Sequence, residues 1–94
     1  MKQITLEVIG PDPPCIRCLM LKKNAQKAAE KLRGDGISVE IKNLNIMAEE
    51  TIMKYGFLFS PAMAVNDIVK FMGMVPSEEE IERVIIEACH SGKS

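Results

Sequence analysis

Two cysteines three positions apart are the residues of this chain best suited to chemistry. Cys15 and Cys18 form a Cys-x-x-Cys motif that follows a predicted strand and loop and opens a predicted helix. At a helix start, free backbone amides and the positive end of the helix dipole stabilise an anion, so a cysteine there favours its thiolate form. A thiolate is the nucleophile of disulfide exchange. The motif therefore predicts that Cys15 attacks a disulfide and Cys18 resolves the mixed disulfide, while Arg17 adds a nearby positive charge.

Other interpretations of the motif remain open. A Cys-x-x-Cys can be half of a zinc site, but four ligands are then needed, and the remaining cysteine and histidine, Cys89 and His90, lie together at the far end of the last predicted helix. Two inert buried thiols would not need this spacing at a helix start. We favour a redox dithiol over a metal- or metalloid-binding carrier, and over an interaction module that keeps the fold without turnover.

The first half of the chain alternates between strand and helix patterns. Apolar and polar residues alternate from Gln3 to Ile9 and again from Ile37 to Lys42, which predicts two strands. Between them, apolar residues at spacings of three and four predict an amphipathic helix from Cys15 to Arg33, with Pro14 suited to its first turn. Two strands joined by a helix should lie parallel, with a right-handed crossover.

A short helix and an apolar segment follow the second strand. The helix is predicted from Ile46 to Tyr55, with Asn43 or Asn45 as its N-cap and acidic residues in its early turns. After it comes Phe57-Leu58-Phe59, which could form an apolar rim beside the dithiol. We expect at least two of these three side chains to lie in the core instead.

The last third of the chain predicts a hairpin and a helix. Two short strands, Ala62 to Val65 and Ile68 to Met72, are joined by Asn66-Asp67, a two-residue hairpin signal. Ser77 and Glu80 form a capping box for the final helix. The predicted fold class is α/β, with the order β-α-β-α-β-β-α and a mixed four-stranded sheet flanked by helices.

Length and composition set the limits of this domain. The 94 residues are 47% apolar and 27% charged, which predicts one globular domain over residues 1–94. Three cysteines are too few, and odd in number, for a secreted disulfide scaffold. No apolar run is long enough for a membrane span or a signal peptide, so we expect a cytoplasmic protein.

The net charge of −1 hides an uneven distribution. Residues 17–33 hold six bases and one acid, a net charge of +5, whereas the rest of the chain holds six bases and twelve acids, a net charge of −6. A basic stripe on one helix could attract phosphate or nucleic acid. No aromatic residue lies among these bases, so we favour a solvated helix face and expect no nucleic-acid partner.

The sequence resembles the thioredoxin-like superfamily, and most closely its very small archaeal and bacterial thioredoxin- or glutaredoxin-like redox-active disulfide proteins. Three segments carry the resemblance over nearly the whole chain. They are the strand followed by Cys15-Ile16-Arg17-Cys18, the segment Ser60-Pro61-Ala62-Met63-Ala64-Val65-Asn66, and Ile68-Val69-Lys70-Phe71-Met72-Gly73 with the helix entry Pro76-Ser77-Glu78-Glu79-Glu80-Ile81. The cysteine motif is moderately specific alone, and the combination is far more so.

The resemblance implies a thioredoxin-like fold and a protein-disulfide reductase. Cys15 would be the nucleophile and Cys18 the resolving residue, with no cofactor beyond the redox-active disulfide and no metal. The resemblance also implies that Pro61 is cis and packs against the disulfide, leaving the Ser60 backbone free to pair with a substrate chain. Arg17 and Pro14 would help to shape this site.

Partners and location are implied in the same way. Disulfide-containing proteins would be the substrates, and a thioredoxin-reductase-like disulfide reductase or glutathione would be the reductant. The resemblance places such a protein in electron transport and cell redox homeostasis. We expect it to work in the cytoplasm as a monomer, without a membrane or nucleic-acid partner.

Some positions depart from the family's pattern. Thioredoxins usually carry an aromatic residue before the motif and Gly-Pro within it, whereas this chain has Pro13-Pro14 and Ile16-Arg17. The aromatic residue of glutaredoxin motifs is also missing, so reductant, glutathione use and reduction potential do not transfer. Cys89 falls on the apolar stripe of the last helix, where we expect a buried small hydrophobe. For Glu7, a candidate buried carboxylate, we expect a structural or partly solvated role.

Overall fold

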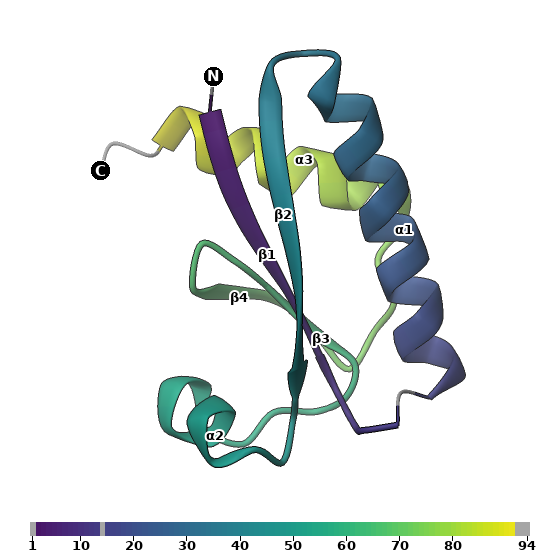
Figure 1. Cartoon of the computed structure of the whole chain (residues 1–94), viewed down its shortest axis with the longest axis vertical. Helices are drawn as coiled ribbons and strands as arrows, with labels where there is room; N and C mark the ends of the chain where they lie inside the picture. The colour runs from purple at the N-terminus through teal and green to yellow at the C-terminus, as the bar shows by residue number, and fades with distance from the viewer. Residues whose placement is uncertain (1, 14, 92–94) are drawn as a thin grey trace.

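The computed structural model describes residues 2–13 and 15–91 and shows the predicted order of elements (Figure 1). Pro14 lies outside the described residues, so its predicted place in the first helical turn is not described. The elements are β1 (Lys2–Gly10), α1 (Ile16–Arg33), β2 (Ile37–Asn45), α2 (Glu49–Tyr55), β3 (Ala62–Val65), β4 (Ile68–Met72) and α3 (Glu78–Ser91).

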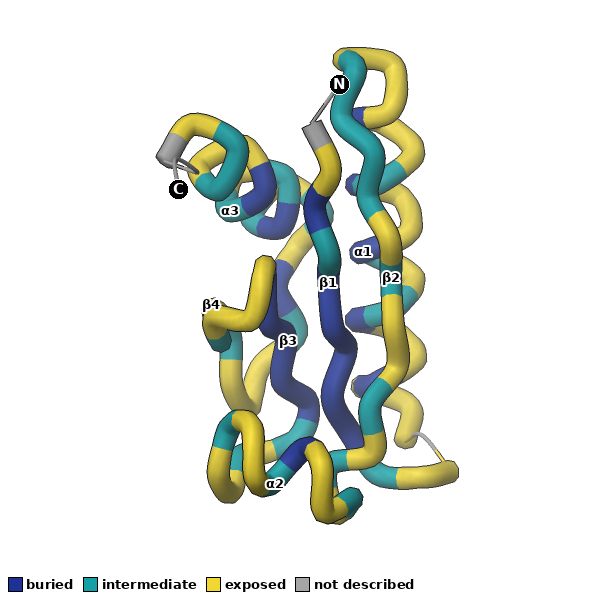
Figure 2. The backbone as a smooth tube through the Cα atoms, turned by 60° about the vertical axis from the view of Figure 1, so that its left-hand side comes forward, coloured by how far each residue is buried: buried dark blue, intermediate teal, exposed yellow. Residues whose placement is uncertain are grey.

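The four strands form one mixed sheet, which confirms the predicted topology. Their order is β2-β1-β3-β4, with β1 parallel to β2, and with β3 antiparallel to both β1 and β4. In this register Leu6 of β1 lies opposite Ile41 of β2 and Val65 of β3. Figure 2 shows β1 and β3 as the buried centre of the sheet, with more exposed strands on either side. The dithiol motif follows the C-terminal end of the central strand β1.

Helices cover both faces of the sheet, because alternate residues of each strand point to opposite faces. The main core joins β1 to α1 and α3 through side chains such as Leu6, Leu21 and Ile81, each with no exposed surface. Burying one such side chain stabilises the fold by about 1.5–3 kcal/mol. A smaller cluster on the other face, built on Ile9, packs against α2 and the segment after it. The start of α1 is thus held on a rigid sheet.

The strong local signals of the sequence are confirmed. Asn66 and Asp67 have φ values of 50° and 71°, the left-handed conformation that the tight β3–β4 hairpin requires. Both hydrogen bonds of the capping box form, with the Ser77 amide donating to Glu80 at 2.8 Å and the Glu80 amide donating to Ser77 Oγ at 3.2 Å. These signals operate within a few residues and do not depend on distant packing.

The end of β2 and the start of α2 differ from their predicted positions. Strand β2 continues to Asn45, because β1 pairs with it along its whole length and the Ile46 amide donates to the Gly10 carbonyl at 2.8 Å. The helix therefore begins at Glu49, with Ala48 rather than an asparagine as its N-cap. The Asn45 side chain instead accepts a hydrogen bond from the Met47 amide, which stabilises the turn after β2.

The expectation that two of the three residues Phe57, Leu58 and Phe59 lie in the core is wrong. Phe57 is 83% exposed and Phe59 is 74% exposed, and only Leu58 packs against the smaller core cluster. The segment is an irregular connection between α2 and β3, and no regular pairing with the sheet places its aromatic side chains in the core. Two aromatic rings are therefore left on the surface.

Candidate active site

The two cysteines of the motif have very different environments. Cys15 is the N-cap of α1 and is exposed, whereas Cys18, within the first helical turn, is buried with 4% of its surface exposed. Their Sγ atoms lie 3.1 Å apart as a thiol–thiol hydrogen bond, and both cysteines are free. One thiol is open to attack from solvent, and the other is shielded directly behind it.

The start of α1 stabilises the Cys15 thiolate. The pKa of Cys15 lies below its ordinary value, chiefly because the Cys18 thiol donates a hydrogen bond to it. Backbone amides of Cys18 and Arg17 act in the same direction. The first turn, which lies wholly within the described part of the chain, has no acidic side chain to oppose them. These contacts support the predicted activation of Cys15.

The Arg17 side chain makes a long-range contact beside the dithiol. Its guanidinium donates to the Gly73 carbonyl at 3.0 Å. The Gly73 amide in turn donates to the Pro61 carbonyl at 2.8 Å. Arg17 thus ties the start of α1 to the turn after β4, and that turn is tied to the proline segment.

The proline segment lies beside the buried thiol. The Ser60–Pro61 peptide bond is cis, as the resemblance implies, and Pro61 is fully buried. Ser60 Oγ lies 3.5 Å from Cys18 Sγ. The fold therefore brings together residues that are 42 positions apart in the sequence. The Asp12–Pro13 bond, in the loop before the motif, is also cis.

Gly10 is a site residue that the sequence analysis missed. A Cβ atom at this position would overlap the Cys18 sulfur and would lie 3.5 Å from Ser60 Oγ. The absence of a side chain at the end of β1 therefore makes room for the buried thiol. The available signal was a glycine ending a strand directly before the loop of the motif, a position where close backbone approach is common.

Glu7 is part of a polar cluster that joins β1 to α2. The carboxylate is buried with 6% of its surface exposed, and it accepts hydrogen bonds from the Tyr55 hydroxyl and from Lys54 Nζ, the latter at 3.2 Å. Lys54 Nζ also pairs with Asp67 at 2.6 Å, and this contact and Glu7 raise the pKa of Lys54. Burial, and then the hydrogen bond with Glu7, raise the pKa of Tyr55 to about 12. These contacts give Glu7 a structural role.

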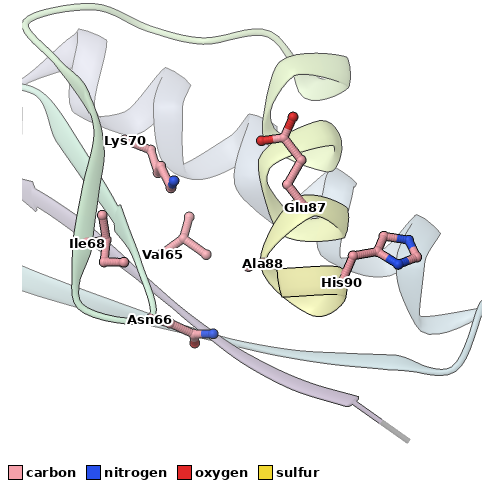
Figure 3. Close-up of a pocket in the computed structure, with 7 residues that line it drawn as sticks. All are labelled: Val65, Asn66, Ile68, Lys70, Glu87, Ala88 and His90. Atoms are coloured by element: carbon pink, nitrogen blue, oxygen red, sulfur yellow. The ribbon is translucent and has the colours of Figure 1, made fainter. Parts of the chain in front are cut away.

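Cys89 is separate from the dithiol. It is half-buried and packs against the main core from α3. Figure 1 shows the C-terminal end of α3 at the opposite end of the molecule from the start of α1. A cavity of about 640 Å³ lies on that side, between the β3–β4 hairpin and α3, with Val65, Lys70 and Glu87 among its lining residues (Figure 3).

Neither a cluster of three or more potential metal ligands nor a membrane-spanning helix is found in the part of the chain that the structure describes. No group of three or more His, Cys, Asp or Glu side chains there could hold a metal ion. No helix within residues 2–13 and 15–91 is long and apolar enough to cross a membrane.

A shielded dithiol at the start of a helix, beside a cis-proline segment on a mixed four-stranded sheet, defines a thioredoxin-like redox protein. The family model for the thioredoxin domain matches residues 4–86. The chain belongs to the thioredoxin family, and it is a thiol-disulfide oxidoreductase. The family implies disulfide substrates and a reductase partner.

Curated archaeal proteins show the same relationship. A protein named Thioredoxin from Methanothermobacter thermautotrophicus is 37% identical over 71 residues, which cover 76% of this chain and 86% of the relative. A Probable Thioredoxin from the same organism is 35% identical over 83 residues, or 87% of this chain and 92% of the relative. Thioredoxin from Methanocaldococcus jannaschii is 32% identical over 68 residues, or 72% of each chain.

Proposed function

We propose that Cys15 is the attacking thiol of this oxidoreductase and that Cys18 is the resolving thiol. The observation that carries the assignment is their unequal exposure at a separation of 3.1 Å. A substrate disulfide can reach the exposed Cys15, and the mixed disulfide that forms there lies within reach of the buried Cys18. The lowered pKa of Cys15 supports the same order, because thiolate is the attacking species.

The reaction proceeds in two exchange steps. The Cys15 thiolate attacks one sulfur of the substrate disulfide, and the other substrate sulfur leaves as a thiolate that takes up a proton. Cys18 then gives up its proton and attacks the Cys15 sulfur, which releases the second substrate thiol. The substrate gains two electrons and two protons, and the protein ends as a Cys15–Cys18 disulfide. Two electrons from the reductant restore the dithiol.

The groups around the dithiol suit a substrate chain in an extended conformation. Ser60 lies beside Cys18, and Pro61 is buried, so we assign the Ser60 backbone to pair with the substrate. Arg17 holds the neighbouring Gly73 turn in place. Pro14, outside the described residues, is assigned to the same site by its position next to Cys15. The exposed ring of Phe59 provides an apolar rim at the entrance to the proline segment.

The partners and setting follow the same proposal. Protein disulfides are the substrates, and a thioredoxin-reductase-like enzyme or glutathione supplies the electrons. The protein acts as a cytoplasmic monomer in electron transport and cell redox homeostasis, without a cofactor other than its own disulfide. It needs neither a nucleic acid nor a membrane for this function.

Reduction of insulin disulfides by the three single cysteine-to-serine variants tests the assignment. Cys15→Ser should abolish turnover, and Cys18→Ser should accumulate a mixed disulfide through Cys15, seen by intact mass. Cys89→Ser is the matched control, and it should keep wild-type turnover. Supplying electrons from NADPH with a thioredoxin reductase, or from glutathione, identifies the reductant. A mixed disulfide on Cys18 of the Cys15→Ser variant, with turnover intact, would contradict the assigned order.

A further inference from the structure

One side of α1 is unusually exposed and lies directly beside the dithiol. Five residues form this outer face of α1, and three of them are large apolar side chains: Ile16 is 74% exposed, and Leu19 and Met20 are each 52% exposed. Lys23 and Lys27 extend the same side along the helix. Spacings of three and four place these residues opposite the buried stripe of α1. Figure 2 shows the buried positions of α1 facing the sheet and its exposed positions facing outward.

The two lysines of the outer face carry charge that the fold does not neutralise. Arg17 and Lys31, which flank this side of the helix, are engaged with the Gly73 carbonyl and with Glu82, the latter at 3.6 Å. Lys23 and Lys27 are exposed, and neither forms an ion pair with any described residue. The one acid of the helix, Glu30, is exposed three residues after Lys27 on the same side, so two lysines against one carboxylate leave this side with a net positive charge.

We propose that the outer face of α1 is a docking surface for protein substrates that carry acidic residues near the reactive disulfide. This inference rests on the proposed function of the dithiol and adds a preference among its substrates. The apolar residues next to Cys15 cover the surface around the substrate's disulfide, and the lysines beyond them attract its carboxylates. The apolar side chains of this face would contact any apolar surface, so the positive charge of the lysines is what selects an acidic partner.

Helix geometry gives the expected position of the substrate's acids. Lys23 and Lys27 lie eight and twelve residues from Cys15, or about 12 and 18 Å along the helix axis. An extended chain covers about 3.3 Å per residue, so acids about four to six residues from the attacked cysteine would reach them. A nucleic acid is a poorer fit, since the outer face holds no aromatic side chain on which bases could stack.

Competing disulfide peptides test the proposal. Three peptides share one disulfide and differ only in a pair of residues, Glu-Glu, Gln-Gln or Lys-Lys, placed about five positions from the cysteine. Stopped-flow mixing with the reduced protein gives their second-order rate constants. We expect the acidic peptide to react about tenfold faster than the basic one at low ionic strength. The ratio should fall below about twofold at ~0.3 M salt, where charges are screened within a few ångströms.

Charge reversal with a matched control locates the effect. Lys23→Glu together with Lys27→Glu should invert the order, so that the basic peptide reacts faster. Lys42→Glu with Lys70→Glu makes the same change in net charge at exposed positions on β2 and β4, and it should preserve the wild-type ratio. The variants are compared by the ratio of the acidic-peptide to the basic-peptide rate constant, because a loss of active protein lowers both rates equally.

Two results would overturn the docking surface while leaving the oxidoreductase intact. One is that all three peptides are reduced at the same rate at low salt. The other is that the ratio of acidic-peptide to basic-peptide rate constants changes equally in the Lys23/Lys27 variant and in the Lys42/Lys70 control. An oligonucleotide that binds through Lys23 and Lys27, with no preference among the peptides, would also reject a protein partner. Failure to reduce any peptide would instead reject the proposed function, and the docking surface with it.

Discussion

Replacing Gly10 with alanine should disable the buried thiol while leaving the rest of the fold in place. The added methyl group would overlap the sulfur of Cys18. Its other close neighbours, Cys18 Cβ and Ser60 Oγ, would each lie at 3.5 Å, which is ordinary contact. The substitution therefore acts on one atom of the site, the sulfur to which we assign the resolving step.

The size of the effect follows from the space that the sulfur needs. A non-bonded carbon contact requires about 3.5–4 Å, so the Cys18 sulfur must move by about 1 Å or more. Overpacking of this kind costs about 1–3 kcal/mol in the free energy of unfolding. Resolution requires the two sulfurs to approach from 3.1 Å to about 2.05 Å, and a 1 Å misplacement can reduce a rate about 100-fold.

Stability and turnover should be measured together. We expect Gly10→Ala to lower Tm by about 4 °C or more, to reduce insulin turnover by about 100-fold and to accumulate mixed disulfides on Cys15. Gly34→Ala is the matched control, since its φ is −64° and its nearest neighbour would be the Lys31 carbonyl at 3.5 Å. It should leave turnover unchanged.

A second background separates the overlap from general damage to the fold. In a Cys18→Ala protein the obstructing sulfur is gone, so adding Gly10→Ala should cost close to nothing in stability. Turnover of Gly10→Ala within about twofold of wild type would refute the reasoning, as would an equal loss of stability in both backgrounds.

Three further measurements test the local chemistry. Cys18→Ala removes the thiol that donates a hydrogen bond to Cys15, so the pKa of Cys15 should rise toward its ordinary value. The pH dependence of Cys15 alkylation measures this pKa, and an unchanged pH profile would contradict the assigned cause. Tyr55 is the sole tyrosine, and its ultraviolet titration should have a midpoint near pH 12. Glu7→Gln should lower this midpoint, because it weakens the hydrogen bond with Glu7 that adds to the effect of burial on the pKa of Tyr55. The stability that comes from the raised pKa is present below about pH 10 and is lost as pH rises through 12. Ser77→Ala should lower the free energy of unfolding by about 1 kcal/mol in a denaturant titration, and no loss would show that the capping box contributes little.

Local patterns in the sequence were sufficient for the order of elements and for the reactive pair. The hairpin turn at Asn66-Asp67 and the capping box at Ser77 formed as predicted, because their hydrogen bonds and backbone angles involve residues a few positions apart. The same is true of Cys15 and Cys18. Residues three apart are neighbours on a helix, so the first turn of α1 brings these two thiols together.

The same local reasoning failed where the register of the sheet decides the outcome. Pairing with β1 extends β2 to Asn45 and moves the start of α2 to Glu49, although nothing near Ile46 in the sequence forbids an earlier helix. Phe57 and Phe59 lie outside the strands, in the irregular connection between α2 and β3, where both rings stay exposed. Apolar residue type predicts burial only when the backbone turns the side chain toward the sheet.

The sequence by itself determined that this protein carries an activated dithiol on an α/β domain, because both properties follow from spacing along one strand and one helix. Only the tertiary structure decided what surrounds the dithiol. It gave Gly10 its role beside Cys18, directed Arg17 to the Gly73 carbonyl 56 positions away, and brought Ser60 next to the buried sulfur. The physical reason is that these contacts join segments far apart in the chain, and their meeting depends on strand order and register rather than on any neighbouring residue.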